Sequence, residues 1–191
     1  MTANKTSIAR VVIPNRKRFR SSESLVDTVD ELRLEEGGSE LVIAGRLAMQ
    51  VYGSELLTCE LELLAWSVPP LVSVYSKKPV KLPSGGVHFE VRNQIPVNII
   101  VRDDELCPLY EEALLQGNRR TGVVPMEYLA VMKMAAGRAK DKLDLTFFLT
   151  HPHLKYSLTR EIAVKYLGWY AGKELDSLSA EAKWKKEAGI E

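Results

Sequence analysis

The stretch ELVIAGRLAMQVYGSELLTCELELLA, residues 40–65, decides the fold because it orders a strand, a turn, a helix and a second strand in one short run. Its first part, residues 40–45, is apolar and ends at Gly45, which predicts a buried strand followed by a tight turn. The next part, residues 46–53, predicts a short helix that a second glycine ends.

Residues 57–65 predict the second strand, and one face of this strand carries two acidic side chains. Side chains alternate between the two faces of a strand, so Glu60 and Glu62 lie on one face while Leu61 and Leu63 lie on the other. Two carboxylates at this spacing are either solvent-facing charges or part of a metal site. The pattern by itself leaves both interpretations open.

The remaining chain divides into further strands and then helices. Apolar residues at helical spacing predict a first helix over residues 23–36. Residues 86–92 and 95–102 alternate between apolar and polar side chains and predict two more strands. From Asp103 the periodicity is helical, and helices are expected at 104–116, 125–149, 158–175 and from 178.

This order of elements predicts an α+β protein. A small mixed sheet flanked by helices is expected over residues 23–102, followed by a helical lobe and C-terminal tail over residues 103–191. Residues 1–22 form a basic arm, with RKRFR at 16–20. The arm is either a surface segment or a phosphate-binding one, since short basic clusters are common.

Composition narrows the class of protein. Hydrophobic residues make up 46%, and the formal net charge of +1 argues against strong overall attraction to nucleic acid or membrane. No apolar run reaches the ~18 residues of a transmembrane helix, so a soluble cytoplasmic protein is expected. Cys59 and Cys107 are expected to be buried free thiols, as in a reducing cytosol. The histidines His88, His151 and His153 do not form a ligand set.

The order of strand, glycine turn, short helix and strand with carboxylates at i and i+2 resembles the nucleotidyltransferase fold of DNA polymerase beta-like enzymes. In that family a Gly-Gly or Gly-Ser turn cradles nucleotide phosphates, an Asp-x-Asp pair holds two magnesium ions, and a third Asp comes from a later strand. The resemblance implies a phosphate turn at Gly45 and Arg46, a metal pair at Glu60 and Glu62, and a third position at Asn98.

A second motif, PMEYLAVMKMAAGRAKDKLDLTFFL at 125–149, is similar to a helix of AbiEii-type and related minimal nucleotidyltransferases. On one continuous helix Lys133, Gly137, Lys140 and Asp144 form a stripe opposite a buried face that includes Leu143. The resemblance implies that the lysine touches the triphosphate and that the aspartates orient basic residues. A structural alternative is that a basic–acidic pair holds the helical lobe on the sheet. The motif residues are Lys133, Arg138, Lys140, Asp141 and Asp144.

The chain departs from the family pattern at each metal-site position. Glutamate at 60 and 62 reaches further than aspartate and is less constrained, and in-line displacement is sensitive to such shifts. The Asn98 amide is neutral and cannot act as a base. Arg46 replaces a small residue, so it either binds phosphate or fills the cleft. These departures predict a weak or missing metal site.

The leading hypothesis is a nucleotidyltransferase-fold protein with impaired catalysis. The resemblance implies a nucleotide-binding or regulatory, partner-binding component of a bacterial or phage-linked toxin–antitoxin or defence module. An alternative is an active enzyme that uses Glu60 and Glu62 with Mg²⁺ or Mn²⁺ to transfer NMP from NTP to RNA or protein. A second alternative is a nucleic-acid-binding module that uses RKRFR and the lysines at 77, 78 and 81. Candidate partners are RNA, another protein or a second copy of the chain, and no membrane.

Overall fold

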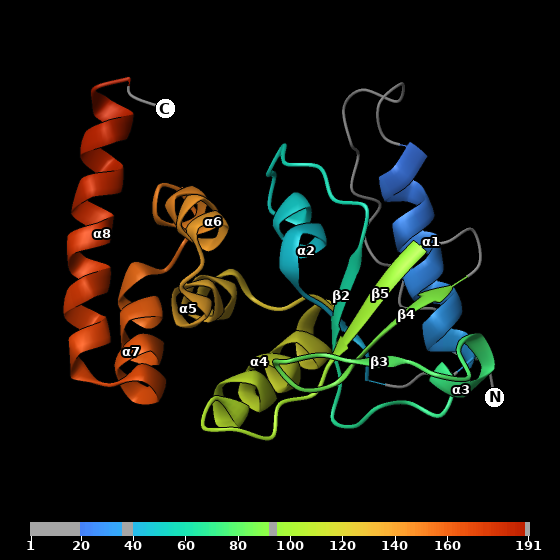
Figure 1. Ribbon diagram of the computed structural model, residues 1–191. Coiled ribbons are helices and arrows are strands. Elements are labelled where there is room, and N and C mark those ends of the chain that lie inside the picture. The colour runs from blue at the N-terminus through green and yellow to red at the C-terminus, as the bar shows by residue number, and fades with distance from the viewer. Residues whose placement is uncertain (1–19, 36–39, 92–94, 190–191) are drawn as a thin grey trace.

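The structure, a computed structural model, describes residues 20–35, 40–91 and 95–189. These residues form a mixed five-stranded sheet and a following group of helices, which confirms the predicted α+β class (Figure 1). The basic arm, residues 1–22, lies outside the described residues except at its end, where the first helix begins at Arg20.

Short apolar segments pair into the sheet. The strand order is β1-β2-β5-β4-β3. The two central strands β2 and β5 run parallel, and the other neighbouring pairs run antiparallel. The strands are β1 (Val42–Ile43), β2 (Leu61–Leu64), β3 (Val80–Lys81), β4 (Val87–Val91) and β5 (Ile95–Ile100).

The alternation of side chains gives the sheet one apolar and one polar face. Leu61, Val97 and Phe89 are buried on one face. Glu62 and Asn98 are half-buried and lie side by side on the opposite face, because their positions are paired in the parallel ladder of β2 and β5. This polar row at the centre of the sheet is where the candidate site is built.

Helices cover both sides of the sheet. Figure 1 shows α1 on one side and α5 to α8 on the other, with α2 close to β2. One buried hydrophobic cluster includes Leu25 of α1, Val97 of β5 and Leu175 of α8, so the sheet and the helical lobe share a core. The helices are α1 (Arg20–Glu35), α2 (Gly45–Val51), α3 (Val72–Tyr75), α4 (Cys107–Arg120), α5 (Met126–Ala136), α6 (Ala139–Leu149), α7 (Tyr156–Leu167) and α8 (Trp169–Glu187).

Arg33 near the end of α1 ties that helix to the rest of the protein. Its guanidinium donates to the carbonyl of Leu41 at 2.8 Å and to the carbonyl of Gly122 at 2.7 Å. The two carbonyls lie before β1 and after α4, and these segments also meet where Ile43 bridges to Val123. Arg33 therefore fixes α1 against the edge of the sheet.

The predicted second strand is shorter than expected. β2 begins at Leu61, and residues 57–60 lie outside it, with Leu57 and Cys59 exposed. Glu60 is held in a local turn, because its amide donates to the Thr58 hydroxyl at 3.4 Å and that hydroxyl donates back to the Glu60 carbonyl at 3.2 Å. The prediction of two buried thiols is also wrong, since Cys59 is exposed and Cys107 is only half-buried.

The single helix predicted over 125–149 is wrong. Gly137 has a φ of +63°, a left-handed conformation that ends α5, and α6 starts two residues later. The break turns the second half of the motif, so Leu143, which was predicted to be buried, is 72% exposed. A second glycine, Gly168, separates α7 from α8 within the predicted 158–175 helix.

Among the described residues, no helix combines the length and the apolar character that crossing a membrane requires.

Candidate functional site

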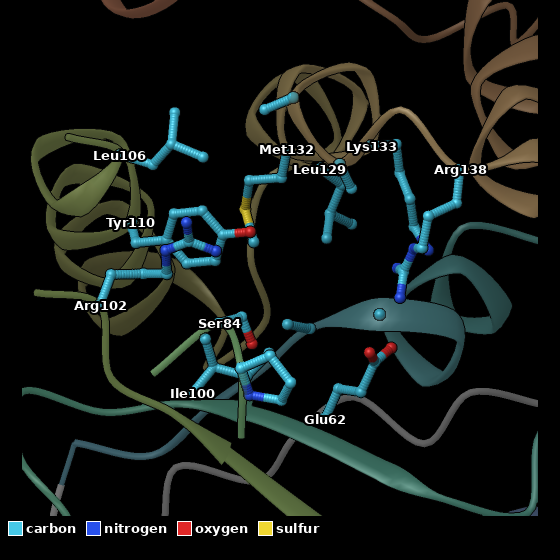
Figure 2. Close-up of a pocket in the computed structure, with 15 residues that line it drawn as sticks. Glu62, Ser84, Ile100, Arg102, Leu106, Tyr110, Leu129, Met132, Lys133 and Arg138 are labelled. Atoms are coloured by element: carbon cyan, nitrogen blue, oxygen red, sulfur yellow. The ribbon is translucent and has the colours of Figure 1, made fainter. Parts of the chain in front are cut away.

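A cleft of about 410 Å³ opens beside the polar face of the sheet (Figure 2). Its walls come from the turn before α2, from β2, from the end of β5, and from α4 and α5. The charged side chains that line it are Glu62, Arg102, Lys133 and Arg138. The cleft therefore joins the glycine turn and the helix motif, two segments that are far apart in the sequence.

The glycine turn and Glu62 are in direct contact. Gly45 begins α2 with a φ of +58°, which L side chains rarely adopt. A Cβ atom at this position would lie 1.6 Å from Oε2 of Glu62, so any side chain would displace the carboxylate. The amide of Ala44 also donates to the Glu62 carbonyl at 2.8 Å, which holds the turn on β2. The small residue is required here by both backbone conformation and space.

Lys133 reaches the cleft from α5 and is paired behind it with two aspartates of α6. Its Nζ atom lies 2.7 Å from Oδ2 of Asp144 and 3.2 Å from Oδ1 of Asp141. Lys133 is only 9% exposed, and both aspartates are fully buried. Buried charges require such partners, so this trio holds α5 and α6 together across the break at Gly137.

Arg138 lies at the break between α5 and α6 and faces the cleft. It binds Asp141 through two guanidinium nitrogens, with Nη2 at 3.1 Å from Oδ1. Burial of Asp141 favours its neutral form, but the hydrogen bond from Arg138 and the charge of Lys133 outweigh burial and lower the pKa of Asp141. The same hydrogen bond raises the pKa of Arg138. Figure 2 shows the Arg138 guanidinium pointing toward the Glu62 carboxylate.

The other predicted basic residues lie away from the cleft lining. Arg46 pairs with Asp144, with 3.8 Å between Nε and Oδ1, so it links α2 to α6 and does not fill the cleft. Lys140 is exposed and is not part of the cleft lining. The predicted stripe of Lys133, Gly137, Lys140 and Asp144 along one helix is wrong, because Gly137 ends α5. Lys133 and Asp144 are buried, whereas Lys140 is exposed.

Arg102 and Tyr110 line the opposite end of the cleft, and the sequence analysis missed both. The Arg102 guanidinium carbon lies 5.0 Å from the centre of the Tyr110 ring, and Asp104 binds the same guanidinium. Burial raises the pKa of Tyr110, so its phenol keeps its proton at neutral pH. No motif marked these residues, because their contact depends on how α4 packs beside the end of β5.

A polar row crosses three strands next to the cleft. Asn98 of β5 is paired with Glu62 of β2 on one side and with His88 of β4 on the other. Oδ1 of Asn98 lies 2.7 Å from Nδ1 of His88. Nδ2 of Asn98 donates to Oε2 of Glu60 at 3.4 Å. The three positions implied by the resemblance, 60, 62 and 98, thus lie near one another, and His88 is an addition that the sequence analysis set aside.

The residues present do not fit a divalent cation. The described part of the chain contains no group of three His, Cys, Asp or Glu side chains close enough to hold a metal. Glu60 accepts from the Asn98 amide and does not line the cleft, whereas Glu62 lies against the glycine turn. Cations of this kind require several converging oxygen ligands. The two glutamates do not provide such a set.

No protein family model, curated protein or solved structure matches this chain. The chemistry of the cleft itself indicates the ligand class. Three cationic side chains and one carboxylate line it, together with the hydroxyl groups of Ser84 and Tyr110. This arrangement suits a small anion that also carries hydrogen-bonding groups.

Proposed function

We propose that this protein is a nucleotidyltransferase-fold protein with impaired catalysis whose cleft binds a nucleotide. The observation that carries the proposal is that Gly45, Glu62, Lys133 and Arg138, which come from two distant motifs, line one cleft. A regulatory role in a toxin–antitoxin or defence module is the part of the proposal that rests on sequence resemblance alone.

Arg138 supports the binding of an anion. Its side chain is 55% exposed, and a guanidinium has five N–H donors, of which Asp141 takes two. A phosphate group can accept from the remaining edge in the bidentate manner that arginine favours. Lys133, already shared between two buried aspartates, contributes mainly by fixing Arg138 and Asp141 in place.

Impaired catalysis is supported by the donors around the glutamates. Asn98, at the position of the third carboxylate, is neutral, and its amide donates to Glu60. A general base must be free to accept a proton from the attacking group. Asn98 does not meet that requirement, so the third carboxylate of the family pattern has no counterpart at this position.

Nucleotide binding is tested by calorimetric titration of the protein with each NTP in EDTA. We expect saturable binding, and we expect Arg138→Ala to weaken it at least tenfold, because the variant removes the exposed cation of the cleft. Arg160→Ala is the matched control: Arg160 forms a similar partly exposed pair, with Asp176, in the α7–α8 region. Equal affinities for the two variants would contradict the proposal.

Catalysis is tested separately by incubation with labelled NTPs, Mg²⁺ or Mn²⁺, and RNA or protein acceptors. We expect no transfer above background. Robust transfer that Glu60→Gln abolishes would show an active nucleotidyltransferase and would overturn the claim of impaired catalysis.

A further inference from the structure

His88 extends the contact between Asn98 and Glu60 into a hydrogen-bonded row. The row runs from His88 on β4 through Asn98 on β5 to Glu60 just before β2. Both contacts are between side chains, and all three residues are half-buried at the polar face of the sheet. Such a row fixes the orientation of its central member.

The chemistry of the row determines how the Asn98 amide is oriented. Its oxygen lies 2.7 Å from Nδ1 of His88, a contact that is a hydrogen bond in the tautomer with its hydrogen on Nδ1. Its Nδ2 then faces Oε2 of Glu60 at 3.4 Å, at the long end of the hydrogen-bond range. The reversed amide would place its oxygen against the Glu60 carboxylate, and two acceptors repel each other.

This orientation is incompatible with a cation between the two side chains. A divalent cation needs lone pairs directed at it, but the amide presents N–H groups on the side of Glu60. To act as a ligand, the amide would have to turn over, and Nδ1 of His88 would have to change from donor to acceptor. With its hydrogen on Nδ1, His88 favours the orientation in which Asn98 cannot bind metal.

We propose that His88 and Asn98 together keep Glu60 from coordinating a divalent cation beside the cleft, so that the ligand of the cleft binds without an ion held by Glu60. The inference rests on the proposed function for the identity of that ligand, a nucleotide. It makes His88 a positioning residue that acts on Glu60 through Asn98.

Two substitutions test the row directly. Asn98→Asp replaces the N–H donor with a carboxylate beside Glu60 and Glu62, and His88→Phe removes the group that holds the amide. We expect the unchanged protein to show no saturable Mn²⁺ binding at micromolar concentrations by electron paramagnetic resonance. We expect Asn98→Asp to gain at least tenfold in Mn²⁺ affinity and His88→Phe to gain severalfold, because the freed amide can turn its oxygen to the ion.

Two further variants separate this mechanism from a simple change of charge. Adding Glu60→Gln to Asn98→Asp is expected to abolish the gain, since Glu60 is the released ligand. Gln116→Glu adds the same charge on α4, where Gln116 contacts Glu112, and is expected to leave Mn²⁺ binding unchanged. A gain in Gln116→Glu equal to that in Asn98→Asp would overturn the proposal.

Other outcomes also decide the question. Tight Mn²⁺ binding by the unchanged protein would overturn the proposal, as would folded His88→Phe and Asn98→Asp variants that gain nothing. If Asn98→Asp does not fold, His88→Phe alone decides. NTP titrations in EDTA on the same variants measure nucleotide binding independently of metal. Failure of the metal inference would appear only in the Mn²⁺ measurement, whereas failure of the proposed function would appear in the NTP titration.

Discussion

At the scale of single residues, Gly45 and Glu62 depend on one another. The glycine has a left-handed backbone, and the glutamate carboxylate occupies the space that a side chain would need. This contact explains why a small residue begins α2 and why the acidic side chain of β2 is held at the wall of the cleft. Neither residue can be understood from its own segment alone.

Gly45→Ala is expected to destabilise the protein by more than the roughly 1–2 kcal/mol that a left-handed residue costs, because it also displaces Glu62. Gly53→Ala is the matched control, since Gly53 has a φ of +92° but no atom within 4 Å of the added Cβ. Urea unfolding measures both. We expect Glu62→Ala to recover part of the loss in the double variant, and strictly additive effects would contradict the contact.

Asp141 is expected to make stability depend on pH in the acidic range. Its folded pKa is lowered, so its stabilising contribution is present above its unfolded pKa, about 3.9, and is lost as the pH falls through the folded pKa. Asp141→Asn should cost about 3 kcal/mol at pH 7, because it removes a partner of buried Lys133. The difference from the unchanged protein should narrow below about pH 4.

The comparison for Asp141 is Asp104→Asn, which breaks a partly exposed ion pair with Arg102. Such pairs contribute at most about 1 kcal/mol, so this variant should change the unfolding free energy little at either pH. A difference between Asp141→Asn and the unchanged protein that stays constant from pH 7 to pH 3 would show that the Asp141 charge is not the cause.

At the scale of elements, the break at Gly137 builds the ion-paired wall of the cleft. Because α5 ends there and α6 runs in a different direction, Lys133 of α5 forms ion pairs with Asp141 and Asp144 of α6. Helical periodicity predicted one continuous helix over both segments and placed Lys133 and Asp144 on one stripe of it. The glycine within the motif was the available signal, since glycine at a left-handed position commonly ends a helix.

Substitution of Gly137 tests the break. Gly137→Ala should destabilise the protein by about 1 kcal/mol, since its φ is +63°, whereas Gly137→Asn should cost less because asparagine tolerates this conformation. The added Cβ has only a distant neighbour, the Met134 carbonyl at 3.9 Å, so packing does not obscure the comparison. Thermal unfolding measures both variants, and a stabilising effect of alanine would indicate that a continuous helix is preferred.

The sequence predicted the sheet better than it predicted the site. Alternation of apolar and polar residues located β4 and β5 but not β3. The resemblance placed positions 62 and 98 near one another, and they are paired in the parallel ladder of β2 and β5. The pairing of His88 with Asn98 was also predictable. The two residues are equally far from Asn93 in the sequence, and consecutive antiparallel strands pair such residues. The contact between Arg102 and Tyr110 was not predictable, since it depends on tertiary packing of α4.

At the scale of the whole molecule, one shared core holds the sheet and the helical lobe on either side of the cleft. The ion pair between Arg46 and Asp144 adds a direct link from α2 to α6. The walls of the cleft are therefore fixed relative to one another. A ligand in it would contact the glycine turn and the α5–α6 break at the same time.

The most direct test of nucleotide binding at this cleft is a crystal structure of the protein with a non-hydrolysable nucleoside triphosphate in EDTA. We expect density for the phosphates beside Arg138, with the rest of the nucleotide extending toward Tyr110 and Arg102. Density at a different surface, or an empty cleft at saturating nucleotide, would contradict the account.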